Sequence, residues 1–219
     1  MEENRLIAHL KKLKNDLAPM TWRQRFSHLW TYYKWVLGVL VFVGFILQVL
    51  ITSLTAANTE ILISGMSINL PLTEEGAACL SHRYFERLEG KQGQDVQFME
   101  EIMNLDNQAM GTETTYATIV KVSGLISTDS LDYLILDTEA REYYSEGDLF
   151  IDLTQIFTAE ELSQMHITAI GGVPKLIDLT GTWFADTHIT GGGPYYLAFA
   201  YNTSRPEQCR DFWQYLNRG

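Results

Sequence analysis

The sequence contains few of the residues from which catalytic and metal sites are usually built. Only two cysteines are present, Cys79 and Cys209, too few for a zinc site made of thiolates alone. None of the five histidines is spaced from another as in a metal-binding helix, and no serine lies in a nucleophile-elbow motif. The glycine-rich stretch 191–194 is no phosphate loop, because no Gly-Lys-Ser/Thr follows it. We therefore expect no enzymatic activity, no metal and no cofactor.

Basic residues are also scarce beyond the first 34 positions. Residues 1–34 hold seven Lys/Arg and three acidic residues, a net charge of +4, whereas the whole chain of 219 residues carries −11. The rest of the chain is therefore strongly acidic. An acidic surface of this kind argues against nucleic acid as a partner.

A long apolar run separates the basic and acidic parts. No charged residue lies between Trp35 and Thr59, and roughly 20 apolar residues are enough to cross a bilayer. A basic flank before such a run places the N-terminus in the cytoplasm. We predict a basic amphipathic cytoplasmic segment over 1–34, one transmembrane helix over 35–57, and an extracytoplasmic domain over 58–219 at the cell membrane, with the lipid bilayer as a partner. A cleaved signal peptide is the alternative, but its basic region would be unusually long.

The exported part alternates between strand and helix patterns. Apolar runs with β-branched residues predict strands over 59–68, 95–103, 133–137 and 195–200. Capping residues and helical spacing predict helices over 73–90, 111–128, 138–147, 158–162 and 204–216, and 175–185 is expected to be extended and hairpin-like. In the 111–128 helix the residues expected to face inward are Tyr116, Ile119, Val120 and Leu125. Alternation of this kind predicts an α/β domain with a mostly parallel sheet.

The ends of two apolar strands supply candidate ligand contacts. Asp137 and Asn202 each follow such a strand, and ligands of parallel sheets gather beyond the carboxyl ends of the strands. This placement would allow both residues to face a cleft, although neither needs to. For Asp137 the favoured interpretation is a helix N-cap, with a ligand contact as the alternative, and Asn202 also suits a turn.

A second group of candidates lies near the end of the chain. Thr182 and Trp183 offer a hydroxyl and a ring to a small solute, although Trp183 also suits a core. Asp186 and His188 would share one face of an extended segment, where a surface pair is favoured over a catalytic one. Cys79 and Cys209 either form one disulfide or remain two separate thiols.

Two stretches resemble known proteins. Residues 120–157 resemble a segment common in extracellular solute-binding proteins of the type 2 periplasmic-binding-protein fold: a helix, an apolar strand ending on Asp137, a helix, and a hydrophobic-Asp-Leu turn at 150–153. Residues 195–216 look like the final strand and helix of the same family, and residues 21–40 are similar to anchors of small membrane proteins of Gram-positive anaerobes. Only about 160 residues are available, so the resemblance implies a reduced form of the two-lobed fold.

The resemblance implies a role and one covalent link. It places the first and last exported helices in one lobe, which makes a disulfide between Cys79 and Cys209 reasonable. It implies a non-enzymatic, membrane-anchored solute-binding or accessory protein that presents a small solute to a membrane transporter or complex. The alternative is an interaction scaffold of a membrane complex with no small-molecule ligand.

Overall fold

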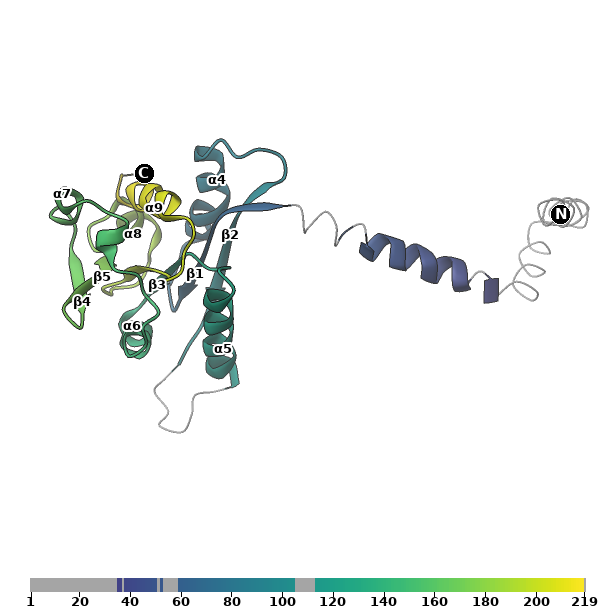
Figure 1. Cartoon of the computed structure of the whole chain (residues 1–219), viewed down its shortest axis with the longest axis horizontal. Helices are drawn as coiled ribbons and strands as arrows, with labels where there is room; N and C mark the ends of the chain where they lie inside the picture. Colours follow the sequence, from purple (N-terminus) through teal and green to yellow (C-terminus); the bar gives the residue numbers. More distant parts are fainter. Residues whose placement is uncertain (1–34, 37, 51, 53–58, 105–112, 219) are drawn as a thin grey trace, which may run out of the picture. The chain divides into compact units, whose positions relative to one another are not determined.

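The computed structural model describes residues 35–36, 38–50, 52, 59–104 and 113–218 (Figure 1). The chain divides into two compact units, Met1–Asn58 and Thr59–Gly219. In the first unit the described residues are helical, and their large apolar side chains from Trp35 to Leu50 are exposed.

Most of the predicted N-terminal organisation lies outside the described residues. The amphipathic segment over 1–34 does so entirely, and the predicted span over 35–57 does so in part. Within the described ranges, no helix combines the length and the apolar character that a bilayer crossing needs.

The second unit is built on one six-stranded sheet with the order β2-β1-β3-β6-β5-β4. Its strands are β1 (Glu60–Ile68), β2 (Gln94–Glu101), β3 (Tyr133–Leu136), β4 (Ile167–Ile170), β5 (Val173–Asp178) and β6 (Tyr196–Phe199). β1 pairs parallel with β2 and with β3, whereas the pairs β3–β6, β5–β6 and β4–β5 are antiparallel. The prediction of an α/β fold is confirmed. The prediction of a mostly parallel sheet is wrong, and the sheet is mixed.

The antiparallel half arises from a hairpin and from the return of the chain. Gly171 and Gly172 join β4 to β5 with φ of 61° and 83°, the positive values that a tight two-residue hairpin turn needs. β6 then enters between β3 and β5, antiparallel to both. An apolar pattern shows that a strand exists but not its direction, so the sequence did not show this arrangement.

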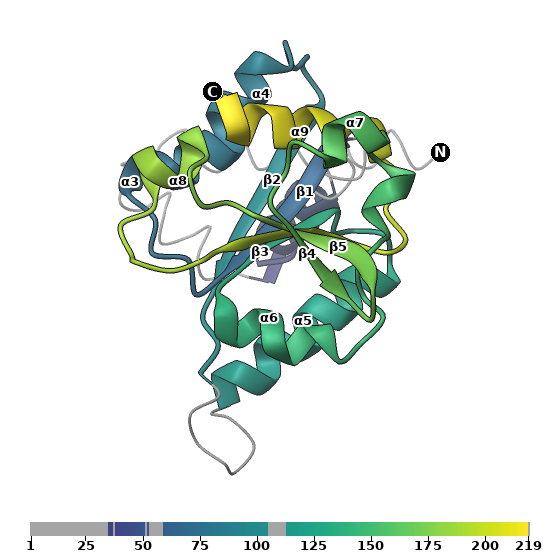
Figure 2. The same cartoon turned by 90° about the vertical axis from the view of Figure 1, so that its left-hand side faces the viewer.

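Helices cover both faces of the sheet (Figure 2). They are α3 (Glu74–Ala78), the π-helix η1 (Cys79–Arg83), α4 (Tyr84–Arg87), α5 (Glu113–Ser127), α6 (Thr138–Ser145), the 3₁₀ turn η2 (Leu153–Gln155), α7 (Ala159–Leu162), α8 (Trp183–His188) and α9 (Pro206–Arg218). Residues of η1, α4, α8 and α9 belong to one core cluster, and residues of α5 and α6 belong to the other. The caps predicted at Thr73 and at the Thr158–Glu161 capping box are confirmed.

Side chains of β3 alternate between the two clusters as a buried strand requires. Tyr133 and Ile135 lie in the first cluster, and Leu134 and Leu136 lie in the second. The Tyr133 ring covers Gly65 of β1 so closely that a Cβ there would lie 1.8 Å from its Cζ. The ring also stacks on Phe212 of α9 at 4.1 Å between centroids. The sheet and the C-terminal helix are therefore in direct contact through one aromatic ring.

The inward face of α5 differs from the predicted one. Tyr116 and Val120 are 65% and 51% exposed, whereas Thr115 and Thr118 are buried, together with Val122 and Ile126. The two threonine hydroxyls explain the rotation, because they donate to the carbonyls of Asn104 (3.0 Å) and Ile102 (3.3 Å) after β2. The expected inward positions Ile119 and Leu125 are partly buried against the second cluster.

Candidate functional site

The strand order creates a switch point between β1 and β3. The connection from β1 to β2 covers the first face through α3 to α4, and the connection from β2 to β3 covers the second through α5. After β1 the chain continues to β2 on one side, whereas after β3 it continues to β4, β5 and β6 on the other side. In α/β sheets, ligands bind outside the carboxyl ends of the strands at such a point. Here the residues that follow β1 and β3 are Asn69 and Asp137.

Asn69 joins three segments at this edge. Its Nδ2 donates to Asp137 Oδ2 (3.1 Å) and to the Met103 carbonyl (2.7 Å), while its Oδ1 accepts from the Met103 amide (2.7 Å). Asn69 has φ of 57°, a left-handed conformation that asparagine tolerates better than most residues. The side chain has used its donors, so Asn69 positions its neighbours and has little left for a ligand.

Asp137 is the N-cap of α6, as the favoured interpretation predicted. Its Oδ1 accepts the Ala140 amide at 2.8 Å. Each carboxylate oxygen thus accepts one hydrogen bond, whereas the group has about four acceptor positions. The side chain is half-buried, so one carboxylate keeps acceptor capacity at the switch point.

A hollow of about 480 Å³ opens beside this pair, at the carboxyl ends of β1 and β2. Its walls combine backbone turns, apolar side chains and carboxylates: Ser67, Asn69, Leu70, Pro71, Leu72, Glu100, Glu101 and Ile102. One of the carboxylates, Glu101, is held by Lys121 of α5 at 2.5 Å. The hollow is large enough for a small solute.

Tyr195 approaches the same edge from the loop before β6. A Cβ at Gly191 would lie 2.3 Å from the Tyr195 hydroxyl and 2.6 Å from Pro71 Cγ, so glycine is needed for this close approach. Burial, and then the negative charge of Asp137, raise the pKa of Tyr195, which keeps the phenol neutral. Among the described residues this hydroxyl has no hydrogen-bond partner, so it is a free donor near a carboxylate. Tyr195 also lines a neighbouring hollow of about 110 Å³ with Asp186.

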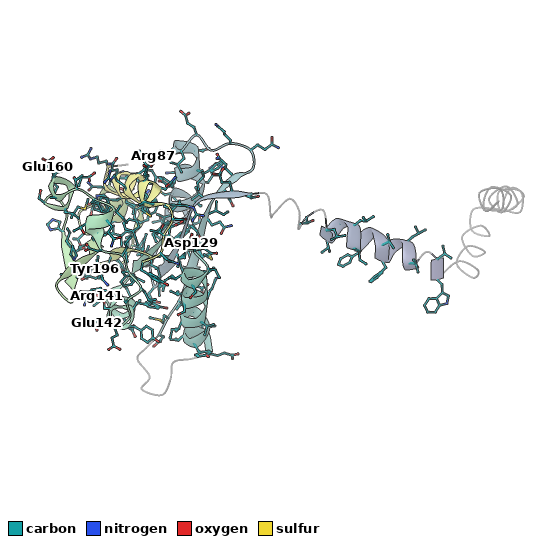
Figure 3. The ribbon with its side chains drawn as sticks, in the orientation of Figure 1. Arg87, Asp129, Arg141, Glu142, Glu160 and Tyr196 are labelled. Atoms are coloured by element: carbon teal, nitrogen blue, oxygen red, sulfur yellow. The ribbon has the colours of Figure 1, made fainter. Side chains whose placement is uncertain are left out.

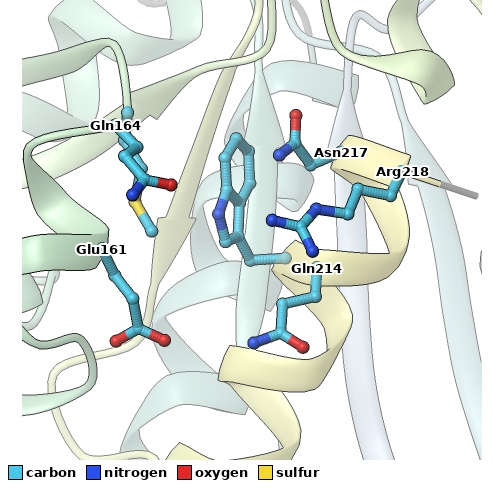
Figure 4. Close-up of a pocket in the computed structure, with 7 residues that line it drawn as sticks. Glu161, Gln164, Gln214, Asn217 and Arg218 are labelled. Atoms are coloured by element: carbon cyan, nitrogen blue, oxygen red, sulfur yellow. The ribbon is translucent and has the colours of Figure 1, made fainter.

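A cation–π contact lies next to this site, and another hollow elsewhere is an alternative to it. Below the sheet, the Arg141 guanidinium of α6 lies 4.9 Å over the ring of Tyr196, which fixes the start of β6 beside Asp137 (Figure 3). A notch of about 60 Å³ lies between α7 and α9, lined by Glu161, Gln164, Met165, Trp213, Gln214, Asn217 and Arg218 (Figure 4). The notch is much smaller than the hollow of about 480 Å³ at β1 and β2, so it is the poorer solute site.

Thr182 and Trp183 do not contribute to the switch point. Thr182 is the buried N-cap of α8: its hydroxyl donates to the Leu179 carbonyl (2.7 Å) and accepts from the Ala185 amide (3.2 Å). The Trp183 ring packs edge-on against His188 at 5.2 Å and near Tyr215 at 5.9 Å. Both residues stabilise the first core cluster.

Asp186 and His188 do not lie on one face, as they would in an extended segment. The segment is helical because Thr182 caps it, and residues two apart on a helix point in different directions. Asp186 lines the smaller hollow, while His188 is buried.

Asn202 lies at the opposite edge from Asp137, so the two candidates do not face one cleft. β6 runs antiparallel to β3, so its carboxyl end meets the amino end of β3. There the Asn202 Nδ2 donates to the Ile126 carbonyl at the end of α5 (2.6 Å). Asn202 therefore holds a turn against α5.

A buried ion pair occupies this opposite edge. Asp132 is fully buried and accepts from the Ser64 amide (2.8 Å), the Thr203 hydroxyl (2.7 Å) and Arg205 Nη1 (3.1 Å to each oxygen). The carboxylate thus ties β1, β3 and the turn before α9 together. Sequence reasoning missed it, because its partners lie up to 73 positions away.

The two cysteines are free thiols, the second of the two alternatives that the sequence left open, and the disulfide that the resemblance made reasonable is not formed. Cys79 Sγ lies 2.9 Å from the Tyr215 hydroxyl, and Cys209 Sγ lies 3.8 Å from the Thr203 hydroxyl. Each thiol therefore faces a hydroxyl on a different segment, although both lie in the first core cluster. Burial raises the pKa of both thiols.

Comparison with known proteins gives no match to a family model, to a curated protein or to a solved structure. Within the described ranges, no three His, Cys, Asp or Glu side chains are grouped as metal ligands would be.

Proposed function

We propose that residues 58–219 form a non-enzymatic, extracytoplasmic domain of reduced type 2 periplasmic-binding-protein type, held at the cell membrane by the predicted span. Its carboxyl-edge site, defined as Asn69, Pro71, Asp137, Gly191 and Tyr195, would bind a small solute. The observation that carries this proposal is the 480 Å³ hollow at the carboxyl ends of β1 and β2, which shares Asn69 and Pro71 with the carboxyl-edge site. The family resemblance adds the expectation of a binding or accessory role.

The groups at the site favour a solute with a hydrogen-bond donor and an apolar part. Asp137 offers free acceptor positions, and Tyr195 offers a hydroxyl that has no partner among the described residues. Leu70, Leu72 and Ile102 supply apolar surface in the adjoining hollow. A hydroxyl, amide or ammonium group near Asp137, with carbon atoms over these side chains, would satisfy both requirements.

The described strands form a single sheet, so the site has one wall where the solute-binding proteins that the sequence resembles have two lobes. A solute bound there would stay open to contact from outside. Such an open site suits an accessory protein that presents a solute to a membrane transporter or complex.

The test is a thermal-unfolding screen of the full chain in mild detergent against sugars, amino acids, peptides and metal ions. A ligand that prefers the native state raises the midpoint, and above the dissociation constant the stabilisation grows with the logarithm of the ligand concentration. Tyr195→Phe removes only the hydroxyl, and Tyr201→Phe is its matched control because Tyr201 is half exposed after β6, at the opposite edge. We expect a selective shift in the wild type and in Tyr201→Phe that is much smaller in Tyr195→Phe. An equal shift in both variants, or no shift across the library, would contradict the proposal.

A scaffold function is the second candidate, favoured by apolar side chains on the surface. Ile102, Tyr116 and Val120, on the end of β2 and on α5, are each more than half exposed. Co-purification in mild detergent should then recover a stoichiometric partner that Val120→Glu releases. A monodisperse protein with no partner would count against this alternative.

A further inference from the structure

His188 is a buried imidazole without a hydrogen bond at one nitrogen. It is the last residue of α8, is 2% exposed, and its Nε2 has no partner within the described ranges. The ring packs against two aromatic rings of its own helix, Trp183 at 5.2 Å and Phe184 at 5.6 Å. These surroundings suit a neutral ring and provide no acceptor for a second N–H.

The backbone around His188 joins α8 to the loop that lines the candidate site. The Thr73 amide donates to the His188 carbonyl (2.9 Å), Leu72 and Ile189 form an antiparallel bridge, and the amide and hydroxyl of Thr190 both donate to the Pro71 carbonyl (2.9 Å each). We call this pair of segments the 71–73/188–190 clip. Pro71 and Leu72 belong to the large hollow, so the clip fixes one of its walls.

His188 Nε2 is closed to solvent while the clip is closed, and the end of α8 packs tightly on α3. Gly76 of α3 packs directly on it, and a Cβ there would lie 3.2 Å from both the His188 Cβ and its carbonyl oxygen. α3 and α8 lie side by side at this point (Figure 2). A water molecule could reach Nε2 only if the segments packed around the ring, α3 and the end of α8 among them, moved apart.

The charged groups around the His188 ring do not reverse its preference for the neutral form. Glu75 on α3 and Arg83 on η1 face it and pair with each other at 3.6 Å. The loop from Leu70 to Thr73 carries no charge, Asp186 of α8 lines the smaller hollow, and α9 contributes only Tyr215 behind Trp183. Burial lowers the pKa of His188, Arg83 lowers it further, and Glu75 opposes both.

We propose that the 71–73/188–190 clip is a pH-sensitive latch: protonation of His188 releases the end of α8 from α3 and frees the loop that lines the hollow. The direction of the pH effect follows from the linkage between proton binding and opening of the clip. The released ring has an ordinary histidine pKa of about 6.5 and takes up a proton before the buried ring does. The clip is therefore fully stable above about pH 6.5 and weakens as the pH falls below that value. The effect on solute binding rests on the proposed function, whereas the opening itself does not.

The test is amide hydrogen exchange of the full chain in mild detergent at pH 7.5 and pH 5.0, corrected for the intrinsic pH dependence of exchange and measured without any solute. In the wild type we expect several-fold faster corrected exchange at pH 5.0 for the amides of Thr73, Ile189 and Thr190. His188→Gln, which cannot take up a proton, should exchange equally at both values. His82→Gln is the matched control, since His82 is exposed and pairs only with Glu86, and it should respond like the wild type.

Two results would overturn the proposal: a wild-type clip that exchanges equally at both pH values, or an acid response that persists in His188→Gln. His188→Phe, which keeps an aromatic ring between Trp183 and Gly76, replaces His188→Gln if that variant does not fold. Because no solute is present, a failed solute screen would leave this result unaffected, and the two proposals fail separately.

Discussion

Removing Arg205 should destabilise the second unit more than removing an exposed ion-pair partner. In Arg205→Met the fully buried Asp132 carboxylate keeps the Ser64 amide and Thr203 hydroxyl but loses its only described cationic partner. Leaving one member of a buried pair uncompensated typically costs about 3–5 kcal/mol. For a unit of this size, the thermal-unfolding midpoint falls by about 2–4 °C for each kcal/mol of stability lost. We therefore expect the midpoint to drop by roughly 6–20 °C.

The assay is urea and thermal unfolding of the fragment 58–219, which contains both core clusters. Asp148→Asn is the matched control: Asp148 pairs with Lys175, but its side chain is 93% exposed, and such pairs contribute about 0–1 kcal/mol. The double variant Asp132→Asn/Arg205→Met should cost less than the sum of the two single changes, because the residues interact directly. A loss below about 1 kcal/mol in Arg205→Met would refute the stabilising role of the buried Asp132–Arg205 ion pair, since exposed pairs reach that range.

Two further predictions concern packing and thiol chemistry. Gly65→Ala should cost about 1–3 kcal/mol or more in urea unfolding, because its Cβ would overlap the buried Tyr133 ring, whereas Gly124→Ala on open α5 surface should gain about 0.5–1 kcal/mol. A Gly65→Ala variant as stable as the wild type would contradict the packing described. Burial raises the pKa of the Cys209 thiol to about 12, and Cys79 is also buried, so both should react with a thiol reagent at pH 8 only when urea unfolds the chain. Rapid labelling of the native protein would show that the thiols are accessible.

Features set by neighbouring residues could be predicted from the sequence. The N-caps at Thr73, Thr158 and Asp137 depend on side chains and amides three positions apart, and all three were predicted. Strands such as β1 and β3 were visible in the same way, from short apolar runs between turn signals.

Features set by distant contacts could not be predicted. The direction of β6 depends on its pairing with β3 and β5. Because β6 runs antiparallel to β3, Asn202 lies at the sheet edge opposite Asp137. The buried face of α5 depends on threonine hydroxyls bonding to the chain after β2, where apolar spacing favoured Tyr116 and Val120. At the site itself, only Asp137 was predicted.

Two members of the carboxyl-edge site had a faint signal in the sequence. Asn69 directly follows an apolar strand, as Asp137 does, and Tyr195 follows a run of glycines that allows close approach of other segments. Neither pattern indicates which residue the side chain will contact, because the hydrogen bond from Asn69 to Asp137 joins residues 68 positions apart. Long-range contacts of this kind can be identified only once the fold is known.

The carboxyl-edge site is tested most directly by hydrogen exchange of the full chain with and without a compound that raises its unfolding midpoint. The account predicts slower exchange in the bound protein at 69–73, 137–140 and 190–195, and loss of that protection in Tyr195→Phe but not in Tyr201→Phe. Protection confined to other segments, such as the notch between α7 and α9, would show that the solute binds elsewhere and would contradict the account.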